Sequence, residues 1–231
     1  MTISVIIPTL NEEQTIRATL AQLYNPAFSS AFAEVLVVDG GSRDRTLENV
    51  AAAAPMVKVL TSPQGRARQM NAGAAVATGD VLLFLHADTL LPATAADDIA
   101  VAMADSLVVG GRFDARLDPD RGLLWIVGRL MSWRSRLTGI ATGDQAIFVR
   151  RKIFEELGGF PDIPIMEDVA FSRRLKWAGR IATLRSCVVA SGRRWEQHGV
   201  ARTILLMWWL RLLFFVGVSP DRLKRLYGDA R

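Results

Sequence analysis

The sequence predicts an α/β fold built on a mostly parallel β-sheet flanked by helices. Its first half alternates short apolar segments with helical patterns, as right-handed strand–helix–strand units do. Two of these segments, residues 35–38 and 81–85, are rich in branched apolar side chains, as expected for strands buried on both faces. The first ends at Asp39 and the second at His86-Ala87-Asp88. Because parallel sheets bind ligands beyond the carboxyl ends of their strands, these acids mark the expected site.

Hydrophobic periodicity and turn residues set the expected element boundaries. We expect strands over residues 3–7, 35–38, 57–60, 81–85, 108–117, 145–149 and 181–189, and helices over 45–54, 66–77, 92–104, 123–133 and 167–178, with a short helix ending at 158. A further helix should begin near Glu12, with Thr9 or Asn11 as its cap and Glu12 and Glu13 in its first turn.

Length and composition suit one α/β domain with a helical appendage. The chain has 231 residues, of which 50% are hydrophobic, and this is ample for one core. Its single cysteine, Cys187, excludes an internal disulfide and indicates a reducing compartment. The residues before Pro8 have neither the basic region nor the long apolar stretch of a signal peptide. We therefore expect a cytoplasmic location.

Charge is unevenly distributed along the chain. Residues 1–111 carry 6 basic and 11 acidic side chains, whereas residues 112–231 carry 22 basic and 12 acidic. A basic half suits nucleic acid, an anionic membrane surface or an anionic substrate. We find no zinc-finger spacing and no aromatic RNA-binding strand, so we expect no nucleic-acid partner. The sequence also lacks the P-loop, dinucleotide and α/β-hydrolase motifs.

Two strand-end acids are candidate ligand contacts, each with a structural alternative. Asp39, followed by two glycines, suits a ribose hydroxyl, or it caps the next helix. Asp88 suits a divalent cation that also binds phosphate oxygens, with His86 beside it, or it caps a turn.

Three further motifs carry charge at expected turns. Arg66 and Arg68 follow Gly65 in a segment that includes Asn71, and they suit a diphosphate or form a solvated basic face. Glu167-Asp168 opens a helix and suits a general base, or it compensates the helix dipole. The segment Arg193-Arg194-Trp195 combines phosphate-binding groups with an aromatic platform, or it is a basic surface turn.

An ordered set of segments resembles the family 2 glycosyltransferases, which have the GT-A fold. The matching segments are SVIIPTLNEE (residues 4–13), VVDGGSRD (37–44), GRARQMNAG (65–73), GDVLLFLHAD (79–88), FVRR (148–151), LGGF (157–160), Glu167-Asp168 and Arg174-Leu175. The resemblance covers roughly residues 2–195, and it is strongest to a small subgroup associated with radical-SAM or selenium-related proteins. It implies a GT-A domain over 1–195, with a nucleotide-sugar half over about 1–111 and an acceptor half over about 112–195. Residues 196–231 would form a C-terminal helical appendage.

The resemblance also implies a role for each candidate residue. The nucleotide-sugar site would be formed by Pro8, Leu10, Glu12, Asp39, Arg66, Asn71, Ala87, Arg193, Arg194 and Trp195. Asp88 matches the last acid of a metal-binding Asp-x-Asp motif, whose first position is His86 here, and Mg²⁺ or Mn²⁺ is the implied ion. Asp168 matches the catalytic base, with Glu167 beside it. Arg193-Arg194-Trp195 resembles the end of a Gln-x-x-Arg-Trp motif, with Ala190 or Ser191 at the glutamine position.

The function implied is inverting sugar transfer from a UDP- or GDP-sugar to an unknown hydroxyl acceptor. A nucleotidyltransferase and a non-catalytic nucleotide-sugar-binding module are the alternatives. The apolar segment 203–218 has 16 residues, fewer than the about 20 that span a membrane. It suits packing on the domain, a homodimer contact or an interfacial helix at the cytoplasmic membrane face, and the last would imply a lipid-linked acceptor.

Overall fold

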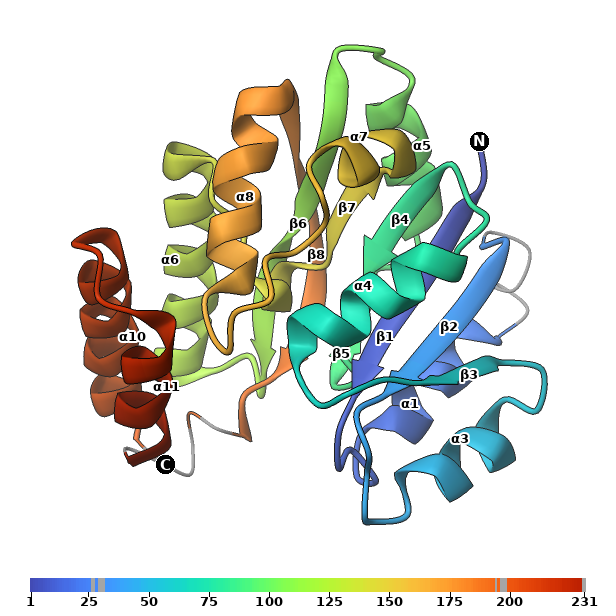
Figure 1. The fold of residues 1–231 in the computed structure, drawn as a ribbon, viewed down its shortest axis with the longest axis horizontal. Helices are drawn as coiled ribbons and strands as arrows, with labels where there is room; N and C mark the ends of the chain where they lie inside the picture. The colour runs from blue at the N-terminus through green and yellow to red at the C-terminus, as the bar shows by residue number, and fades with distance from the viewer. Residues whose placement is uncertain (26–27, 29–31, 194, 196–198, 230–231) are drawn as a thin grey trace.

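The computed structural model describes residues 1–25, 28, 32–193, 195 and 199–229. A curled eight-stranded sheet runs through the molecule in the order β3-β2-β1-β4-β7-β6-β8-β5 (Figure 1). The strands are β1 (Ile3–Thr9), β2 (Glu34–Asp39), β3 (Lys58–Thr61), β4 (Val81–Phe84), β5 (Thr89–Leu90), β6 (Val108–Asp118), β7 (Ile147–Arg150) and β8 (Arg180–Ser191). The helices are α1 (Ile16–Leu23), α3 (Thr46–Ala53), α4 (Arg66–Val76), α5 (Ala95–Met103), α6 (Gly122–Thr138), α7 (Arg151–Glu156), α8 (Glu167–Ala178), α10 (Val200–Phe215) and α11 (Pro220–Asp229), with a 3₁₀ turn at Gly143–Gln145.

The predicted parallel arrangement is confirmed for the first half. β1 pairs in parallel with β2 and β4, and β2 pairs in parallel with β3. In the second half β6 parallels β8, while β7 runs antiparallel to both β4 and β6. Phe84, the last residue of β4, is therefore opposite Ile147, the first residue of β7. This register brings the segment before β7 to the carboxyl end of β4.

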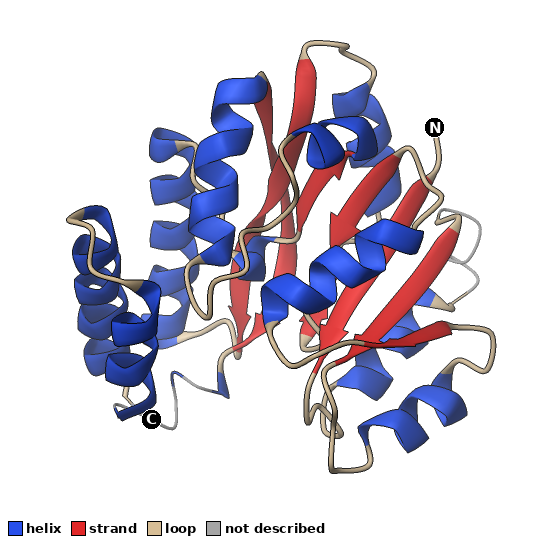
Figure 2. Cartoon of the chain, in the orientation of Figure 1, coloured by secondary structure: helices blue, strands red, loops and turns tan. Residues whose placement is uncertain are grey.

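Helices cover both faces of the sheet (Figure 2). Side chains of α1, α3 and α5 pack with Val5 and Ile7 of β1, whereas those of α4, α7 and α8 pack with Ile6 on the other face. Alternate residues of one strand thus enter two separate cores, and this explains the continuous apolar runs in the sequence. Full burial of each Val, Leu or Ile side chain contributes roughly 1.5–3 kcal/mol.

The first helix begins later than the sequence predicts. It starts at Ile16, it has no side-chain cap, and its first turn contains no acidic residue. Asn11 adopts a left-handed conformation with φ 55°, and Glu12 donates its N–H to the Thr46 hydroxyl over 2.7 Å. The expected capping by Thr9 or Asn11 is therefore wrong, because the chain around Glu12 is tied to the neighbouring loop instead of entering the helix.

The C-terminal apolar segment also differs from its predicted extent. It forms α10, which ends at Phe215, and a second helix, α11, follows after Gly217 at φ 87°. Leu210 and Leu223 are completely buried against the loop that precedes α8 and against the start of α8. The helices α10 and α11 therefore pack on their own domain. None of the described helices is long and apolar enough to cross a membrane. The boundary expected at residue 195 stays a prediction.

Glu34 joins four segments at the amino-terminal edge of the sheet. Its Oε1 accepts hydrogen bonds from the Ser4 hydroxyl at 2.7 Å and from both the N–H and the hydroxyl of Thr78 at 2.6 and 2.7 Å. Its Oε2 accepts one from Lys58 Nζ at 2.7 Å. Burial alone would raise the pKa of Glu34, but these donors outweigh it and lower the pKa to about 2.

We expect Glu34→Gln to lower the free energy of unfolding by about 2 kcal/mol at pH 7. A carboxyl whose pKa is depressed by folding stabilises above its unfolded pKa and loses that contribution as the pH falls through the folded one. The deficit should therefore shrink between about pH 4.5 and pH 2. Urea unfolding across this range measures it, with exposed Glu48→Gln as the control. A deficit independent of pH would contradict the assignment.

Candidate active site

Two loops at the carboxyl ends of β1 and β2 are hydrogen-bonded to each other. Asn11 donates its N–H to the Ser42 hydroxyl over 2.9 Å, and the Asn11 side-chain oxygen accepts the N–H of Arg43 at 2.9 Å. Glu13 accepts the N–H of Arg45 at 3.1 Å. These contacts fix the backbone where parallel strands bind ligands.

Asp39 organises its own turn. Its carboxylate is 2% exposed and accepts the N–H groups of Gly41 and Ser42 at 2.9 and 3.0 Å and the Ser42 hydroxyl at 2.5 Å. Gly41 has φ 90°, a conformation that glycine adopts without strain. Asp39 therefore holds its own turn and does not cap α3, whose N-cap is Arg45, so the helix-cap alternative is wrong. Contact with the nucleoside stays a prediction.

Gln69, which the sequence reading missed, braces the same strand ends. It is 4% exposed in α4, and its amide nitrogen donates to the carbonyls of Thr9 at 2.7 Å and Val38 at 2.8 Å. A Cβ at Gly40 would lie 3.0 Å from the Gln69 side-chain amide, so a larger residue there would require that amide to shift. The sequence does contain a signal for this role, since Gln69 is a polar residue on the buried side of a helix rich in small residues.

Several residues that were predicted to contact the nucleotide have partners within the protein. Both polar ends of the Asn71 amide bind the Phe160 backbone, at 2.8 and 2.9 Å, so Asn71 fastens that loop to α4. The Ala87 side chain lies in the core, and its carbonyl accepts the Thr19 hydroxyl at 2.8 Å. Pro8 and Leu10 are half-buried at the end of β1. A nucleotide contact by each of these residues stays a prediction.

The segment after β8 returns to the loop after β1. Arg193 donates to the Gln14 side chain over 2.7 Å, which brings a guanidinium to the expected donor edge. Trp195 instead packs on the apolar cluster beneath α6. Arg194 lies outside the described residues.

Glu12 and Asp88 form an acidic pair at this edge. Burial raises the pKa of Glu12 and the charge of Asp88 raises it further, while a 2.8 Å hydrogen bond from Thr15 and the charges of Arg193 and His86 lower it. Like charges held together in this way suit a cation.

The described residues contain no group of three or more His, Cys, Asp or Glu side chains arranged as metal ligands. A hard divalent cation bound to a diphosphate needs only one or two protein carboxylates. Asp88, with Glu12 and His86 nearby, fits that smaller donor set.

Asp168 lies at the start of α8, on the other side of the sheet end. Its Oδ2 accepts the Gly143 N–H at 2.8 Å and its Oδ1 accepts the Val169 N–H at 2.7 Å. A carboxylate oxygen has two lone-pair sites, so each oxygen retains one for a further proton donor. A small pocket links this residue to the strand ends and is lined by Arg66, Met70, Phe84, His86, Gly143, Ile147, Phe160, Glu167 and Asp168.

The loop over residues 142–145 touches both halves of the site. His86 Nδ1 lies 3.1 Å from Asp144 Oδ1, and a Cβ on Gly143 would lie 2.2 Å from His86 Nε2. The same glycine donates to Asp168. His86 therefore contacts this loop, and the charges of both His86 and Asp88 act on Glu12.

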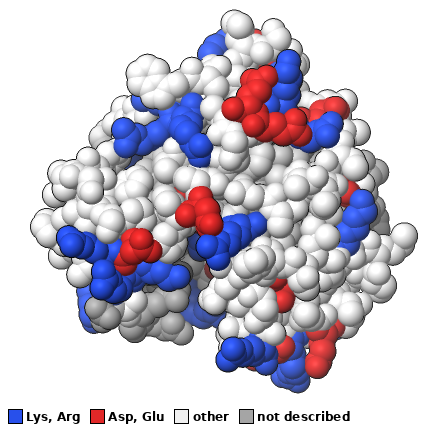
Figure 3. Space-filling view, viewed as in Figure 1, with Lys and Arg blue, Asp and Glu red and all other residues white. Residues whose placement is uncertain are grey.

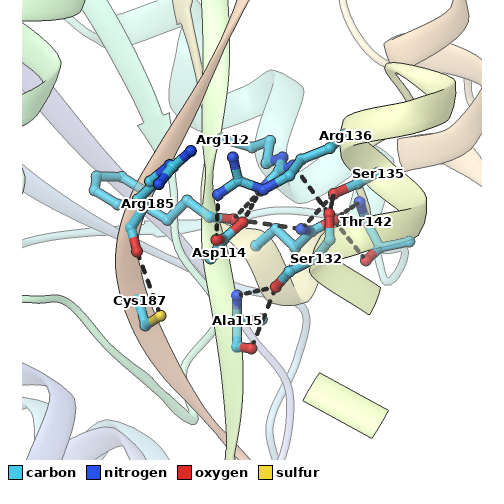
Figure 4. Close-up of polar contacts among 11 residues, drawn as sticks. Arg112, Asp114, Ala115, Ser132, Ser135, Arg136, Thr142, Arg185 and Cys187 are labelled. Atoms are coloured by element: carbon cyan, nitrogen blue, oxygen red, sulfur yellow. Dashed lines mark hydrogen bonds and ion pairs between the residues drawn. The ribbon is translucent and has the colours of Figure 1, made fainter. Parts of the chain in front are cut away.

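A polar network beneath α6 holds this loop (Figure 4). Gln145 is completely buried and donates to the Ser135 hydroxyl at 2.9 Å, and its oxygen accepts the Thr142 N–H at 3.2 Å. Behind it, Asp114 pairs with both Arg112 and Arg136. Thr142 and Gln145 form a capping box for the turn that carries Gly143.

Arg66 pairs with Glu167 across the pocket. Arg66 Nη1 lies 3.5 Å from Glu167 Oε1, and Glu167 is 4% exposed. Burial raises the pKa of Glu167, Arg66 opposes this, and Asp168 adds to it. Burial would lower the pKa of Arg66, but the charges of Glu167, Asp168 and Asp144 outweigh it and raise that pKa above its usual value. The predicted catalytic pair and the predicted phosphate-binding arginine are thus brought together.

Acids and arginines gather at the carboxyl ends of a mostly parallel sheet, where folds of this kind bind their ligands. Residues 4–158 match the family described as Glycosyl transferase family 2, and the chain belongs to that family. The resemblance to the family 2 glycosyltransferases and the fold class expected from the sequence are confirmed, whereas the narrower subgroup stays a prediction.

Relatives include a probable glycosyltransferase of Bacillus subtilis (strain 168), 29% identical over 194 residues, covering 75% of this chain and 46% of the relative. A PGL/p-HBAD biosynthesis glycosyltransferase of Mycobacterium bovis (strain BCG / Pasteur 1173P2) is 32% identical over 169 residues, covering 68% of this chain and 62% of the relative. The chain thus spans about half to two thirds of the length of these proteins.

Solved structures show the same fold. A mannosyltransferase from Pyrobaculum calidifontis in complex with GDP-Man and Mn²⁺ has a TM-score of 0.68 at 25% identity, covering 99% of this chain and 68% of that one. S. aureus TarS 1-349 in complex with UDP has a TM-score of 0.65 at 20% identity, covering 100% and 70%.

We expect Gly143→Ala to lower kcat/KM for nucleoside diphosphate release by about 100-fold, because the new methyl group must displace the His86 ring or the loop that positions Asp168. Gly228→Ala in α11, where a Cβ has no neighbour within 4 Å, is the matched control. Wild-type activity in Gly143→Ala would show that the loop does not position the reacting groups.

Proposed function

We propose that the chain transfers a sugar from a UDP- or GDP-sugar to an acceptor hydroxyl, with inversion at the anomeric carbon. The observation that carries the proposal is the position of Asp168, a carboxylate oriented by two backbone N–H groups in a pocket that reaches the strand ends. Family membership favours sugar transfer over the nucleotidyltransferase and non-catalytic alternatives.

The mechanism follows from this arrangement. A free lone pair of Asp168 takes the proton of the acceptor hydroxyl, whose oxygen forms a bond to the anomeric carbon as the bond to the diphosphate breaks. Attack opposite the leaving group inverts the configuration. Arg66 and Arg193 supply positive charge near the developing diphosphate anion.

A divalent cation, Mg²⁺ or Mn²⁺, fits beside Asp88 with Glu12 and His86 nearby, and it would neutralise charge on the leaving group. The presence of Mn²⁺ in the mannosyltransferase complex supports this choice. The complexes with GDP-Man and with UDP support a nucleotide-sugar donor without selecting its base. Assignment to the radical-SAM- or selenium-associated subgroup remains a proposal that rests on sequence resemblance alone.

We expect Asp168→Asn to lower kcat by about 10²–10⁴-fold while leaving nucleoside diphosphate affinity within about twofold, because the base acts on the acceptor and not on the donor. Initial rates of nucleoside diphosphate release and calorimetric titration measure the two quantities. Asp97→Asn, on the exposed side of α5, is the control. Near-wild-type turnover in folded Asp168→Asn would remove the assigned base.

We further propose that the acceptor is lipid-linked and that the protein meets it at the cytoplasmic face of a membrane. The outer sides of α6 and α10 expose large apolar residues: Leu123, Trp125, Ile126, Leu130, Trp133 and Leu137 on α6, and Leu205, Trp208, Trp209, Leu212 and Phe215 on α10. Basic side chains gather at the end of the molecule formed by the C-terminal helices (Figure 3). Aromatic side chains beside basic ones are typical of interfacial helices.

We expect the chain to float with vesicles that contain anionic lipid, and the double variant Trp208→Ser/Trp209→Ser to lose most of this binding. Trp177→Ser, at an 88% exposed tryptophan on α8, should float like the wild type. A wild-type chain that stays unbound and sediments as a dimer would assign this surface to a homodimer contact instead.

A further inference from the structure

Arg134 in α6 and Arg211 in α10 are two cations whose pKa values are both influenced by the charge of Asp168. Arg134 is half-buried in α6, and its Nε and Nη2 atoms are shielded from solvent without a hydrogen-bond partner among the described residues. Arg211 is half-buried in α10. Buried polar groups are ordinarily hydrogen-bonded, so the two shielded and unpartnered donor atoms of Arg134 are available to an anionic partner.

The packing of α10 holds Arg211 in this place. Its neighbour Leu210 is completely buried among Ile140, Met166 and Val169, which flank the start of α8. Val200 and Ile204, at the other end of α10, pack on the cluster beneath α6. The helix is therefore anchored to both α6 and α8.

The charges around the pair are unbalanced. The pKa of Arg134 is lowered to about 10, first by burial and then by the positive charges of Arg211 and Arg112, against the opposing charge of Asp168. Burial also lowers the pKa of Arg211, against the charges of Asp168 and Asp144. The charge of Asp168 thus acts on each guanidinium group, and the two guanidinium groups repel each other.

The nearby carboxylates already have other partners. Asp114 pairs with Arg112 and Arg136, Asp144 lies against His86, and Asp168 accepts two backbone N–H groups. Within the part of the chain that the structure describes, neither Arg134 nor Arg211 is in an ion pair.

We propose that Arg134 and Arg211 bind a phosphate group of the acceptor and so place its hydroxyl at Asp168. Guanidinium forks match the geometry of phosphate oxygens, and a dianion between two cations removes their repulsion. The proposal rests on the proposed function and deepens it by naming the acceptor class as a phosphorylated alcohol. The lipid-carried form agrees with the acceptor proposed above, and a soluble one is the other outcome of the test.

The test is phosphate binding, measured by thermal shift on the full chain with a nucleoside diphosphate and Mg²⁺ present to fill the donor site. Inorganic phosphate should raise the Tm of the wild type. In Arg134→Gln/Arg211→Gln its affinity should fall at least about tenfold. Arg129→Gln on α6 and Arg202→Gln on α10, both at exposed positions, should bind phosphate like the wild type.

Folding is checked in the same experiment. Neither arginine forms an ion pair among the described residues, so the double variant should melt no lower than the wild type without phosphate. Should it unfold, Arg134→Lys and Arg211→Lys keep the charge without the fork, and they should retain the fold with weaker phosphate binding.

Two probes distinguish the sources of the phosphate. Loss of glycerol 3-phosphate binding in the double variant identifies a soluble acceptor, and loss of binding to phosphatidic acid in phosphatidylcholine vesicles identifies a lipid one. Unchanged binding of all three phosphate probes would overturn the proposal. Turnover retained by Asp168→Asn would contradict the proposed function but would leave this binding result standing, so the two failures are distinguishable.

Discussion

The hydrogen bond from the Gly143 N–H to Asp168, at 2.8 Å, joins the two halves of the site. One residue further along, Asp144 contacts His86 at the end of the β4 segment. This is possible because β7 pairs antiparallel with β4, which delivers residues 142–145 to the carboxyl ends of the parallel strands. The buried Gln145 and the ion pairs behind it keep the turn in place. Without this loop the strand-end acids and the base would have no common support.

The sequence predicted most of the sheet because buried strands have a simple pattern. The runs at 35–38 and 81–85 could be recognised without any knowledge of their partners. The structure extends the first by one residue at each end and ends the second one residue earlier, at Phe84. The start of α1 could not be predicted, because it depends on hydrogen bonds from Asn11 and Glu12 to residues some thirty positions away. Local capping preferences do not include such contacts.

The candidate site residues also divide into those that the sequence could reveal and those that depend on packing between distant segments. Asp168 and Glu167 were found because a helix start is visible in the sequence, and the structure places both in the pocket. The bracing by Gln69, the contact of Asn71 with Phe160 and the pairing of Arg66 with Glu167 all depend on packing between distant segments. The C-terminal helices add another such case, since the charge of Asp168 acts on Arg211, whose neighbour Leu210 is buried beside the start of α8.

We infer that donor and base lie in separate halves of one site. Calorimetric titration of a nucleoside diphosphate, with and without Mg²⁺, into the wild type, Asp88→Asn and Asp168→Asn distinguishes these halves. We expect Mg²⁺ to strengthen binding to the wild type and to Asp168→Asn but not to Asp88→Asn. If Mg²⁺ strengthened binding to Asp88→Asn equally, or failed to strengthen binding to Asp168→Asn alone, this division of the site would be contradicted.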